Sequence, residues 1–412
     1  MVTLIQLGKY LNKLNKSFWV DWTTVYSYNK LLDDLNRIKN FPEICLKKDP
    51  YEVFLNLLLS ILNNKVIILL DSDFSEEEYS KLMDDGSNIS KSFSNEVEVN
   101  STAELIERIR KLNSWKITLY TSGTTGLPKK VIHTFDALTR SVQISEKHKG
   151  DIWGFAYNPT HIAGLQVFFQ GFLNQNTIVN LFKKPHNEIK VLVDKYKISH
   201  ISATPTFYRL LDDKDKIFCV RRVTSGGERL DQNTGEKIMS IFPNAKLRNV
   251  YASTEAGTIF SASGDTFTIL PELNELIKIE DNEIVIKSSL IGIPNFDKEW
   301  YNTGDIVEII SKSPLKFRFL NRKNELINVG GMNVNPNEVE ETIKSLDGIK
   351  DVLVYAKKNS LIGNILCADI IGELSEKDIR LALKNLIQPF KIPRIINFVS
   401  ELKTTRTGKK QR

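Results

Sequence analysis

The chain has 412 residues, of which 41% are hydrophobic and 26% are charged. This composition is typical of a protein that buries large cores, so it excludes a fibrous chain and a wholly disordered one. The net charge of +6 is small for this length and by itself predicts no nucleic-acid partner. Residues 403–412 carry five basic groups and no acidic one, so nearly all of the excess charge lies in this tail.

Cysteine usage and apolar patterning indicate a cytoplasmic protein. The three cysteines (Cys45, Cys219 and Cys367) lie far apart, without metal-ligand spacing, and an odd, sparse set argues against a secreted disulfide framework. The N-terminus lacks the continuous apolar stretch of a signal peptide. Residues 54–70 are the richest apolar stretch, but asparagines and a lysine interrupt it, so it predicts a buried helix and strand rather than a membrane span. The sequence does not predict an oligomeric state.

The apolar spacing predicts an α/β domain over most of the chain. A polar stretch over residues 76–100 predicts a surface connection. Elsewhere strand-like and helical patterns alternate, which favours a largely parallel sheet. The predicted elements are a helix at 51–62, a strand at 66–70, a helix at 103–112, strands at 116–120 and 152–157, a helix at 164–173, a strand at 177–181 and a helix at 189–196.

The last 90 residues or so have a different pattern. Asn335 precedes a proline and then Glu338, which predicts a capped helix start. Around it we expect strands at 316–320, 352–355, 365–370 and 394–399, with a second helix at 375–387. This order predicts a compact α+β module. The resulting division is a large N-terminal domain over residues 1–321 and a small C-terminal domain over residues 322–412.

The sharpest local signal is the loop over residues 120–130, YTSGTTGLPKK, which we call the phosphate loop. Its glycines let the backbone approach an anion closely, its hydroxyls offer donors, and Lys129 supplies a positive charge. It is not a Walker A loop, which needs glycine directly before a Lys-Ser/Thr pair. By composition alone, an ordinary surface loop is as well supported as an anion site. The candidate binding residues are Thr121, Ser122, Gly123, Thr124, Thr125, Gly126 and Lys129.

The phosphate loop resembles the signature of the AMP-forming acyl-activating superfamily, which includes acyl- and aryl-CoA synthetases and adenylation enzymes. Lys130 replaces the last glycine of the family pattern. Further segments resemble family motifs in family order, and the resemblance covers about residues 50–412. These segments are 225–228 (SGGE), 251–255 (YASTE, with Ala252 in place of glycine), 301–305 (YNTGD), 321–322 (NR) followed by Gly330, Gly331 and 338–340 (EVE), and 405–412 (TRTGKKQR).

The resemblance implies a reaction in two halves. A carboxylate attacks the α-phosphorus of ATP to give an acyl adenylate and pyrophosphate, and a thiol then displaces AMP. Bringing an anion to a polyanion requires positive charge at the attacked phosphorus. The family assigns this task to the lysine that matches Lys409, although an isolated basic tail is more often solvated charge. The implied cofactors are ATP, Mg²⁺ and either CoA or the phosphopantetheine of a carrier protein.

The resemblance also implies roles around the nucleotide. Glu255 would hold Mg²⁺, a hard cation that prefers oxygen ligands, and Thr254 would bond the α-phosphate. Tyr251 would stack on adenine, although without the family it would be interpreted as core. Asp305 would accept from the ribose hydroxyls, and Arg322 would reach the same sugar. Gly226, Gly227 and Glu228 would form the adenine-side turn.

The acid pocket is implied by residues 158–165, NPTHIAGL, which resemble the family segment that lines it. A lone histidine beside apolar residues is more often structural, but the motif order favours His161 as a pocket wall or gate. Gly164, Ala252, Ser253 and Gly226 would form other sides of this pocket. A small residue at position 252 leaves room for an aryl or branched acid.

Several functions remain open at this point. An acyl- or aryl-CoA ligase and a ligase that loads a carrier protein share the first half-reaction. The short N-terminal region and the segments around His161 and Gly331 look most like the o-succinylbenzoate–CoA ligase branch. The departures Lys130, Ala252 and Asn324, the last at the usual hinge aspartate, suggest a catalytically weakened nucleotide-binding homologue, which the retained Lys409, Glu255 and Asp305 disfavour. A nucleic-acid binder that uses the basic tail is a further alternative.

Overall fold

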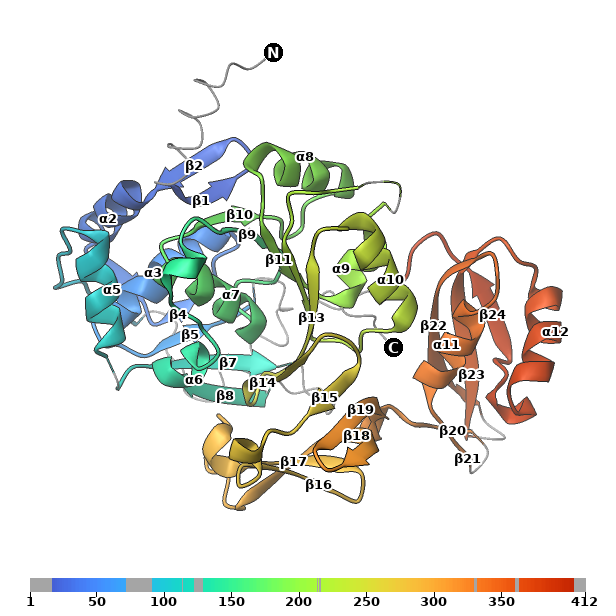
Figure 1. Ribbon diagram of the computed structural model, residues 1–412. Helices are drawn as coiled ribbons and strands as arrows, with labels where there is room; N and C mark the ends of the chain where they lie inside the picture. Colours follow the sequence, from blue (N-terminus) through green and yellow to red (C-terminus); the bar gives the residue numbers. More distant parts are fainter. Residues whose placement is uncertain are drawn as a thin grey trace, which may run out of the picture. The chain divides into compact units, whose positions relative to one another are not determined.

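The structure, a computed structural model, describes residues 17–71, 91–112, 114–121, 129–212, 214, 216–329, 332–359 and 363–403. Its internal contacts divide the chain into two compact units (Figure 1). Unit 1 contains residues 1–264 and 288–298, and unit 2 contains residues 265–287 and 299–412. The predicted division between residues 321 and 322 follows chain order alone and stays a prediction.

An eight-stranded sheet is the centre of unit 1, in the order β14-β13-β12-β11-β9-β10-β1-β2. The strands from β13 to β1 pair in parallel, while β14 and β2 pair antiparallel at the two edges, which confirms the predicted largely parallel sheet. The strands are β1 (Ser17–Asp21), β2 (Thr24–Ser27), β9 (Ile152–Phe155), β10 (Thr177–Asn180), β11 (His200–Ala203), β12 (Arg222–Gly226), β13 (Lys246–Ser253) and β14 (Gly257–Ala262).

A second sheet of unit 1 has the order β4-β5-β7-β8, with β8 antiparallel to β7. Strand β6 (Ser92–Ser94) lies inside the predicted polar connection and pairs with β3 (Asn40–Pro42), so the connection contains a short strand that the sequence did not predict. The reason is Phe93, whose ring packs 5.7 Å from that of Phe41 and gives this polar stretch an anchor. The strands of the second sheet are β4 (Ile44–Cys45), β5 (Ile67–Leu69), β7 (Lys116–Thr121) and β8 (Lys129–Thr134).

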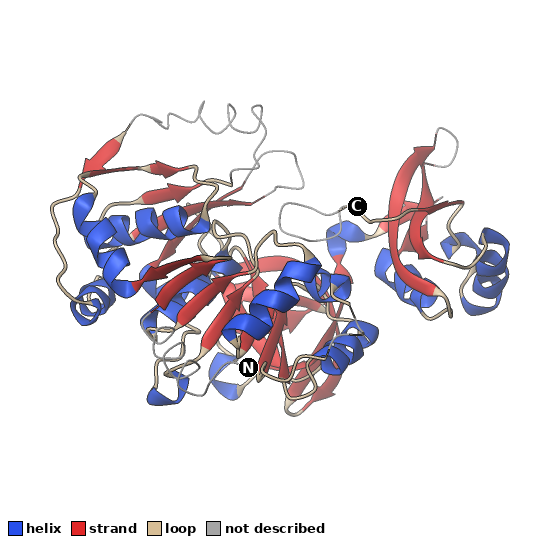
Figure 2. Ribbon diagram, turned by 90° about the horizontal axis from the view of Figure 1, so that it is seen from above, coloured by secondary structure: helices blue, strands red, loops and turns tan. Residues whose placement is uncertain are grey.

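Helices cover the strands of unit 1, as Figure 2 shows. One hydrophobic core joins both sheets to α3 (Pro50–Leu62) and α7 (Ile162–Leu173), and these helices are buried nearly all round because they are apolar on every side. Phe54 of α3 stacks on Phe168 of α7 with ring centroids 4.0 Å apart. A second core packs α8 (His186–Tyr196), α9 (Pro205–Leu210) and α10 (Gln232–Ile241) on the large sheet. Within the described residues, the other α-helices of unit 1 are α2 (Tyr28–Arg37), α5 (Thr102–Arg110) and α6 (Phe135–Thr139).

Unit 2 contains a five-stranded antiparallel sheet and an α+β module. The sheet has the order β15-β19-β18-β17-β16, and the module has a three-stranded sheet in the order β22-β23-β24. The module helices begin as predicted, because Asn335 and Ser375 side chains accept from backbone amides at their first turns. The elements are β15 (Thr266–Thr268), β16 (Ile277–Glu280), β17 (Glu283–Lys287), β18 (Trp300–Lys312), β19 (Leu315–Arg322), β20 (Ile327–Val329), β21 (Met332–Val334), α11 (Pro336–Lys344), β22 (Ile349–Asn359), β23 (Gly363–Gly372), α12 (Glu376–Leu386) and β24 (Ile395–Phe398).

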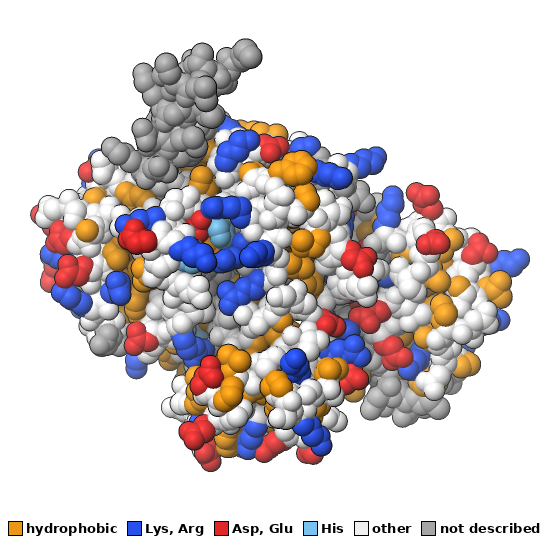
Figure 3. All heavy atoms as spheres, in the orientation of Figure 1, with side chains coloured by type: hydrophobic (Ala, Val, Ile, Leu, Met, Phe, Trp, Pro, Cys, Tyr) orange, Lys and Arg blue, Asp and Glu red, His pale blue; other side chains and the backbone are white. Residues whose placement is uncertain are grey.

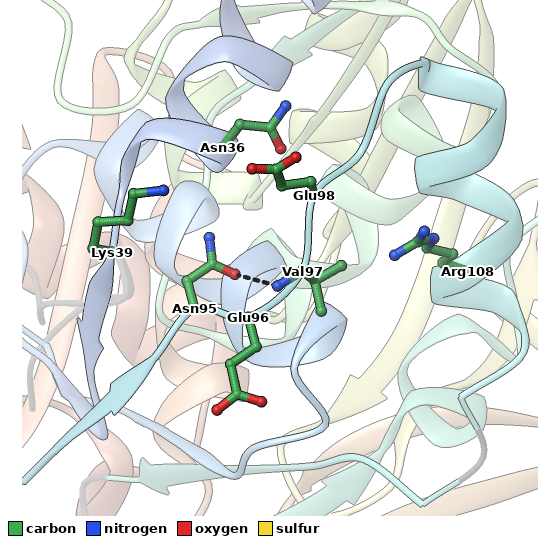
Figure 4. Close-up of a pocket in the computed structure, with 7 residues that line it drawn as sticks. All are labelled: Asn36, Lys39, Asn95, Glu96, Val97, Glu98 and Arg108. Carbon is green, nitrogen blue, oxygen red and sulfur yellow. Dashed lines mark hydrogen bonds between the residues drawn. The ribbon is translucent and has the colours of Figure 1, made fainter.

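The surface of unit 1 carries a polar hollow of about 460 Å³ (Figure 4). The Asn36 side chain bonds both the amide and the carbonyl of Val99, and Asn95 accepts from the Val97 amide. The two asparagine side chains therefore attach the segment around Val97 and Val99 to α2, and none of the lining residues belongs to the family motifs.

Elsewhere, acidic and basic side chains are interspersed on the face in view (Figure 3). Among the residues with a described structure, no helix is both long and apolar enough to cross a membrane.

A buried network lies at the amino ends of β9 and β11. The Asp151 carboxylate accepts from His148 Nδ1 at 3.0 Å and from Arg221 at 2.9 Å, and His200 Nε2 lies 3.5 Å from it. His200 also bonds Ser199 Oγ at 2.8 Å and stacks on Trp153. Burial lowers the pKa of His200 to about 4; Asp151 opposes this shift, while Arg222, Arg221 and His148 add to it. His200 is therefore neutral in the folded protein near pH 7.

We expect the free energy of unfolding to decrease as the pH falls from about 6.5 to about 4. The unfolded His200 binds a proton in this range and the folded one does not, so protons favour the unfolded state. His200→Gln removes the titrating ring and keeps an amide that reaches Ser199. Urea unfolding near pH 7 and near pH 5 should show a smaller loss for this variant. An equal loss in the two proteins would contradict the assignment.

Candidate active site

The turn between β13 and β14, which we call the 254–256 turn, accepts a hydrogen bond at each of its three carbonyl groups. His133 Nε2 donates to the Thr254 carbonyl oxygen at 2.7 Å, and the Gly292 amide donates to that of Glu255 at 2.8 Å. Arg140 Nη2 donates to the Ala256 carbonyl oxygen at 2.5 Å. The Ser253 hydroxyl accepts from the Ala256 amide at 3.2 Å. The backbone of the turn is therefore fixed from several elements at once.

Two of these donors come from one segment, residues 129–140, which leaves the phosphate loop and which we call the exit segment. It contains β8 and α6 and ends at Arg140, the residue that follows α6. The Ile132 amide also donates to the Gly292 carbonyl oxygen at 2.7 Å. A Cβ at position 292 would lie 2.3 Å from the Ile132 carbonyl oxygen, so this close approach requires glycine.

The same arrangement brings Lys129 and Glu255 together, two residues that the sequence predicts to act on the ATP phosphates and Mg²⁺. Lys129 Nζ lies 3.5 Å from Glu255 Oε1, and the two side chains are 39% and 19% exposed. A partly exposed carboxylate beside an ammonium offers an oxygen ligand to a hard cation and a positive charge to a phosphate. The donor chemistry of this pair therefore fits Mg²⁺ bound to a phosphate chain.

The protonation states of the two side-chain donors are set by burial. Burial lowers the pKa of His133, so its ring is neutral near pH 7 and carries its proton on Nε2, where the Thr254 carbonyl oxygen accepts it. Burial also lowers the pKa of Arg140, but a guanidinium keeps its charge in proteins. Arg140 therefore makes a charge-assisted bond to a buried carbonyl group.

The predicted adenine-side turn begins at the carboxyl end of β12. A Cβ on Gly226 would lie 3.1 Å from the Val250 carbonyl oxygen, and Gly227 has φ of +86°. The first position therefore favours glycine because the backbones approach closely, and the second because of its positive φ. Glu228 accepts from the Thr206 hydroxyl at 2.8 Å and from Arg209 Nη2 at 2.9 Å. Its other oxygen is buried without a hydrogen bond. Glu228 thus has a structural partner, and its role toward a nucleotide stays a prediction.

Tyr251 lies on β13 opposite Phe260 of β14, with the ring centroids 5.9 Å apart. Ala252 and Ser253 complete this strand, and Ser253 is the residue that accepts from the 254–256 turn. The structure therefore places all three beside Thr254 and Glu255. Stacking on adenine and contact with an acid stay predictions for these residues.

The predicted acid-pocket histidine has a buried partner that sequence reasoning missed. His161 lies at the start of α7, and its Nε2 is 3.1 Å from Asp71 Oδ2, which also accepts from Asn158 Nδ2 at 2.9 Å. Asp71 is 6% exposed and follows β5, a buried strand that pairs in parallel. An acidic residue directly after such a strand is a usable sequence signal, because ligands bind outside the carboxyl ends of parallel strands. Gly164 lets α7 approach this turn, since a Cβ there would lie 2.2 Å from the Asn158 carbonyl oxygen.

The predicted ribose residues meet in unit 2. Asp305 on β18 lies opposite Arg322 on β19, and Arg322 Nε donates to Asp305 Oδ1 at 2.8 Å. Asp305 is 5% exposed, and Gly304 before it has φ of +76°. The antiparallel register therefore pairs the two side chains that the sequence assigned to one sugar.

Several predicted residues lie outside the described part of the chain and keep their predicted roles only. They are Ser122, Gly123, Thr124, Thr125, Gly126, Gly330, Gly331 and Lys409, and for Thr121 and Asn324 the side chains are not described.

The sequence matches a known family of proteins. The sequence profile described as "AMP-binding enzyme" matches residues 59–296, and that of the AMP-binding enzyme C-terminal domain matches residues 338–409. The 2-succinylbenzoate–CoA ligase of Listeria monocytogenes is 28% identical over 73% of this chain and 70% of the relative. The enzyme of the same name from Lactococcus lactis is 26% identical over 71% of this chain and 69% of the relative.

Solved structures share the fold. The o-succinylbenzoate CoA synthetase of Bacillus subtilis, in complex with its acyl-adenylate intermediate, superposes with a TM-score of 0.68 at 19% identity, covering 97% of this chain and 96% of that one. The anthranilate CoA ligase AuaEII, in complex with anthranoyl-AMP, gives a TM-score of 0.72 at 17% identity, covering 98% and 95%. The predicted fold class, a large α/β N-terminal part with a small α+β C-terminal part, is therefore confirmed.

We expect Arg209→Met to destabilise the protein by about 3 kcal/mol, because it leaves the Glu228 carboxylate buried without its cation. Adding Glu228→Gln should recover part of this loss. Urea unfolding measures both effects. Arg318→Met is the matched control, since its partner Glu308 is 44% exposed and an exposed ion pair contributes little to stability. Equal effects of the two arginine substitutions would contradict a buried role for the Arg209–Glu228 pair.

Proposed function

The chain belongs to the AMP-binding enzyme family, and from that premise we propose that it activates an aromatic carboxylic acid of the 2-succinylbenzoate class. It is an AMP-forming acid–thiol ligase that uses ATP, Mg²⁺ and CoA. A carboxylate oxygen bonds to the α-phosphorus of ATP while the bond to pyrophosphate breaks. The CoA sulfur then bonds to the acyl carbon, and AMP leaves.

The proposed ATP site rests chiefly on one contact in this chain, the approach of the Lys129 ammonium to the Glu255 carboxylate. An ATP phosphate chain presents several negative charges, which an ammonium and a carboxylate-bound cation offset from two sides. When ATP enters, Lys129 would exchange its carboxylate partner for a phosphate oxygen. Glu255 would hold Mg²⁺, and the bound ion would offset negative charge on the phosphates. Thr254 and the phosphate-loop hydroxyls and amides would bond the remaining phosphate oxygens.

The other nucleotide contacts are proposed from the family resemblance, and the described positions are compatible with them. Tyr251, Gly226 and Gly227 would contact the adenine, each from the carboxyl end of a parallel strand. Asp305 would accept from the ribose hydroxyls, with Arg322 holding its carboxylate in place. Lys409 would bridge the acid carboxylate and the α-phosphate, and so lower the repulsion between two anions.

The acid would bind against His161. Asp71 accepts from one ring nitrogen of His161, which orients the ring and sets its tautomer. Gly226, Gly164, Ala252 and Ser253 would form the other walls, and the small side chain at position 252 leaves room for an aromatic ring. The names of the curated relatives support 2-succinylbenzoate itself as the first acid to test.

The acid and the thiol are identified by one screen. AMP formation would be followed with 2-succinylbenzoate, benzoate, anthranilate and a straight-chain acid, first with CoA and then with a pantetheinylated carrier protein. The proposal predicts that an aromatic acid with CoA gives the fastest turnover. Preference for the straight-chain acid would contradict the acid assignment. Preference for the carrier protein would contradict CoA as the acceptor.

The proposal includes a cytoplasmic location. The three cysteines are free, two of them are buried, and the reaction consumes ATP and CoA. Reducing conditions keep such thiols unpaired.

We expect Lys409→Ala to lower the exchange of pyrophosphate into ATP by at least about 100-fold, because the variant lacks the charge at the attacked phosphorus. Lys410→Ala is the matched control and should exchange at close to the wild-type rate. Isotope exchange with saturating acid measures both. An active Lys409→Ala protein, or a wild-type protein that no carboxylic acid stimulates, would refute the mechanism.

A further inference from the structure

We propose that His133 and Arg140 are positioning residues of the nucleotide site. They hold the 254–256 turn by its carbonyl groups and thereby set where Glu255 presents its carboxylate to Mg²⁺-ATP. This inference rests on the proposed function, because it concerns the same site. Neither side chain reaches the reacting atoms by this assignment; each acts through the turn.

Every carbonyl group of the 254–256 turn has a hydrogen-bond donor from the protein. Three consecutive carbonyl groups accept from three donors, of which His133 and Arg140 lie on the exit segment and the third is the Gly292 amide. A hairpin turn at a surface leaves such groups to water. Here Ala256 is 2% exposed and His133 is 3% exposed, so protein groups replace water and fix the peptide planes.

A further support is the origin of the donors. His133 and Arg140 lie four and eleven positions after Lys129, on the exit segment that continues the phosphate loop. Lys129 itself lies 3.5 Å from the Glu255 carboxylate. One segment therefore meets the 254–256 turn at three points, and any shift of the turn changes the distance between the ammonium and the carboxylate.

Other hydrogen bonds keep the β13–β14 hairpin folded, so the bonds from His133 and Arg140 serve to position the turn. The turn retains the bond from the Ala256 amide to the Ser253 hydroxyl and the bond from the Gly292 amide to the Glu255 carbonyl when either side-chain donor is removed. The hairpin strands also keep their ladder, which pairs residues 249–253 of β13 with 257–262 of β14. Loss of one donor is therefore expected to displace the Glu255 carboxylate while the hairpin stays folded.

The test compares disruptive and conservative variants. Arg140→Met and His133→Leu remove the donors at similar size, whereas His133→Gln retains an N–H group that reaches the same carbonyl. We expect the two disruptive variants to raise the Mg²⁺ concentration for half-maximal pyrophosphate exchange by about tenfold, as loss of a group that orients a metal ligand does. KM for the acid should stay within about twofold, and His133→Gln should recover most of the loss.

Arg380→Met is the matched control. Arg380 also donates to backbone carbonyl groups, those of Pro393 and Arg394, but within unit 2. It should leave the Mg²⁺ dependence unchanged. A tenfold change in this control, or unchanged Mg²⁺ dependence in both disruptive variants, would overturn the proposal. If a disruptive variant fails to fold by thermal melting, His133→Asn and Arg140→Gln, whose shorter side chains stop before the carbonyl groups, are measured in its place, and wild-type Mg²⁺ dependence of both then overturns the proposal.

Calorimetric titration with ATP, with and without Mg²⁺, separates this inference from the proposed function, because it needs no acid. If wild type binds Mg²⁺-ATP but no acid supports exchange, the acid–thiol function fails and the positioning role is still decided by binding. We then expect Arg140→Met and His133→Leu to weaken Mg²⁺-ATP binding about tenfold and to leave Mg²⁺-free ATP binding nearly unchanged. Equal weakening with and without Mg²⁺, or no ATP binding by wild type, would overturn the positioning role.

Discussion

The attachment of the 254–256 turn to the exit segment is the constraint on which the candidate site depends. A buried carbonyl group without a donor is costly, and each of the three carbonyl groups in this turn accepts from a protein donor. The partners are His133, Arg140 and Gly292, and the first two continue the phosphate loop. Satisfying the backbone of the turn therefore also brings Lys129 to Glu255. Backbone hydrogen bonding and the placement of charge for ATP are one arrangement in this fold.

Each unit positions its own predicted residues in a different way. In unit 1 the parallel strands β5, β12 and β13 position Asp71, Gly226 and Tyr251 at or near their carboxyl ends. In unit 2 the antiparallel register of β18 and β19 does the same for Asp305 and Arg322 by direct pairing. Parallel strands gather residues from distant parts of the sequence at one edge, whereas an antiparallel pair brings together residues close to a single hairpin.

The sequence predicted what periodicity and motif spacing encode. The strand–helix alternation and the Asn335 cap were accessible in this way. The family resemblance assigned Lys129 and Glu255 to the phosphates and Mg²⁺ and Asp305 and Arg322 to one sugar, and the structure adds that the members of each pair lie in contact. Single residues that act over long separations were not. His133 contacts Thr254 across 121 positions and Asp71 contacts His161 across 90, and neither pair leaves a periodic trace. The strand β6 was missed because one phenylalanine anchors a stretch that is otherwise polar.

A crystal structure with ATP and Mn²⁺ tests the central claim most directly, since Mn²⁺ replaces Mg²⁺ and is located by its anomalous scattering. We expect a metal peak within bonding distance of the Glu255 carboxylate, with Lys129 Nζ on a phosphate oxygen and the 254–256 turn still bonded to His133 and Arg140. A metal bound away from Glu255, or a nucleotide whose phosphates do not reach Lys129, would contradict it.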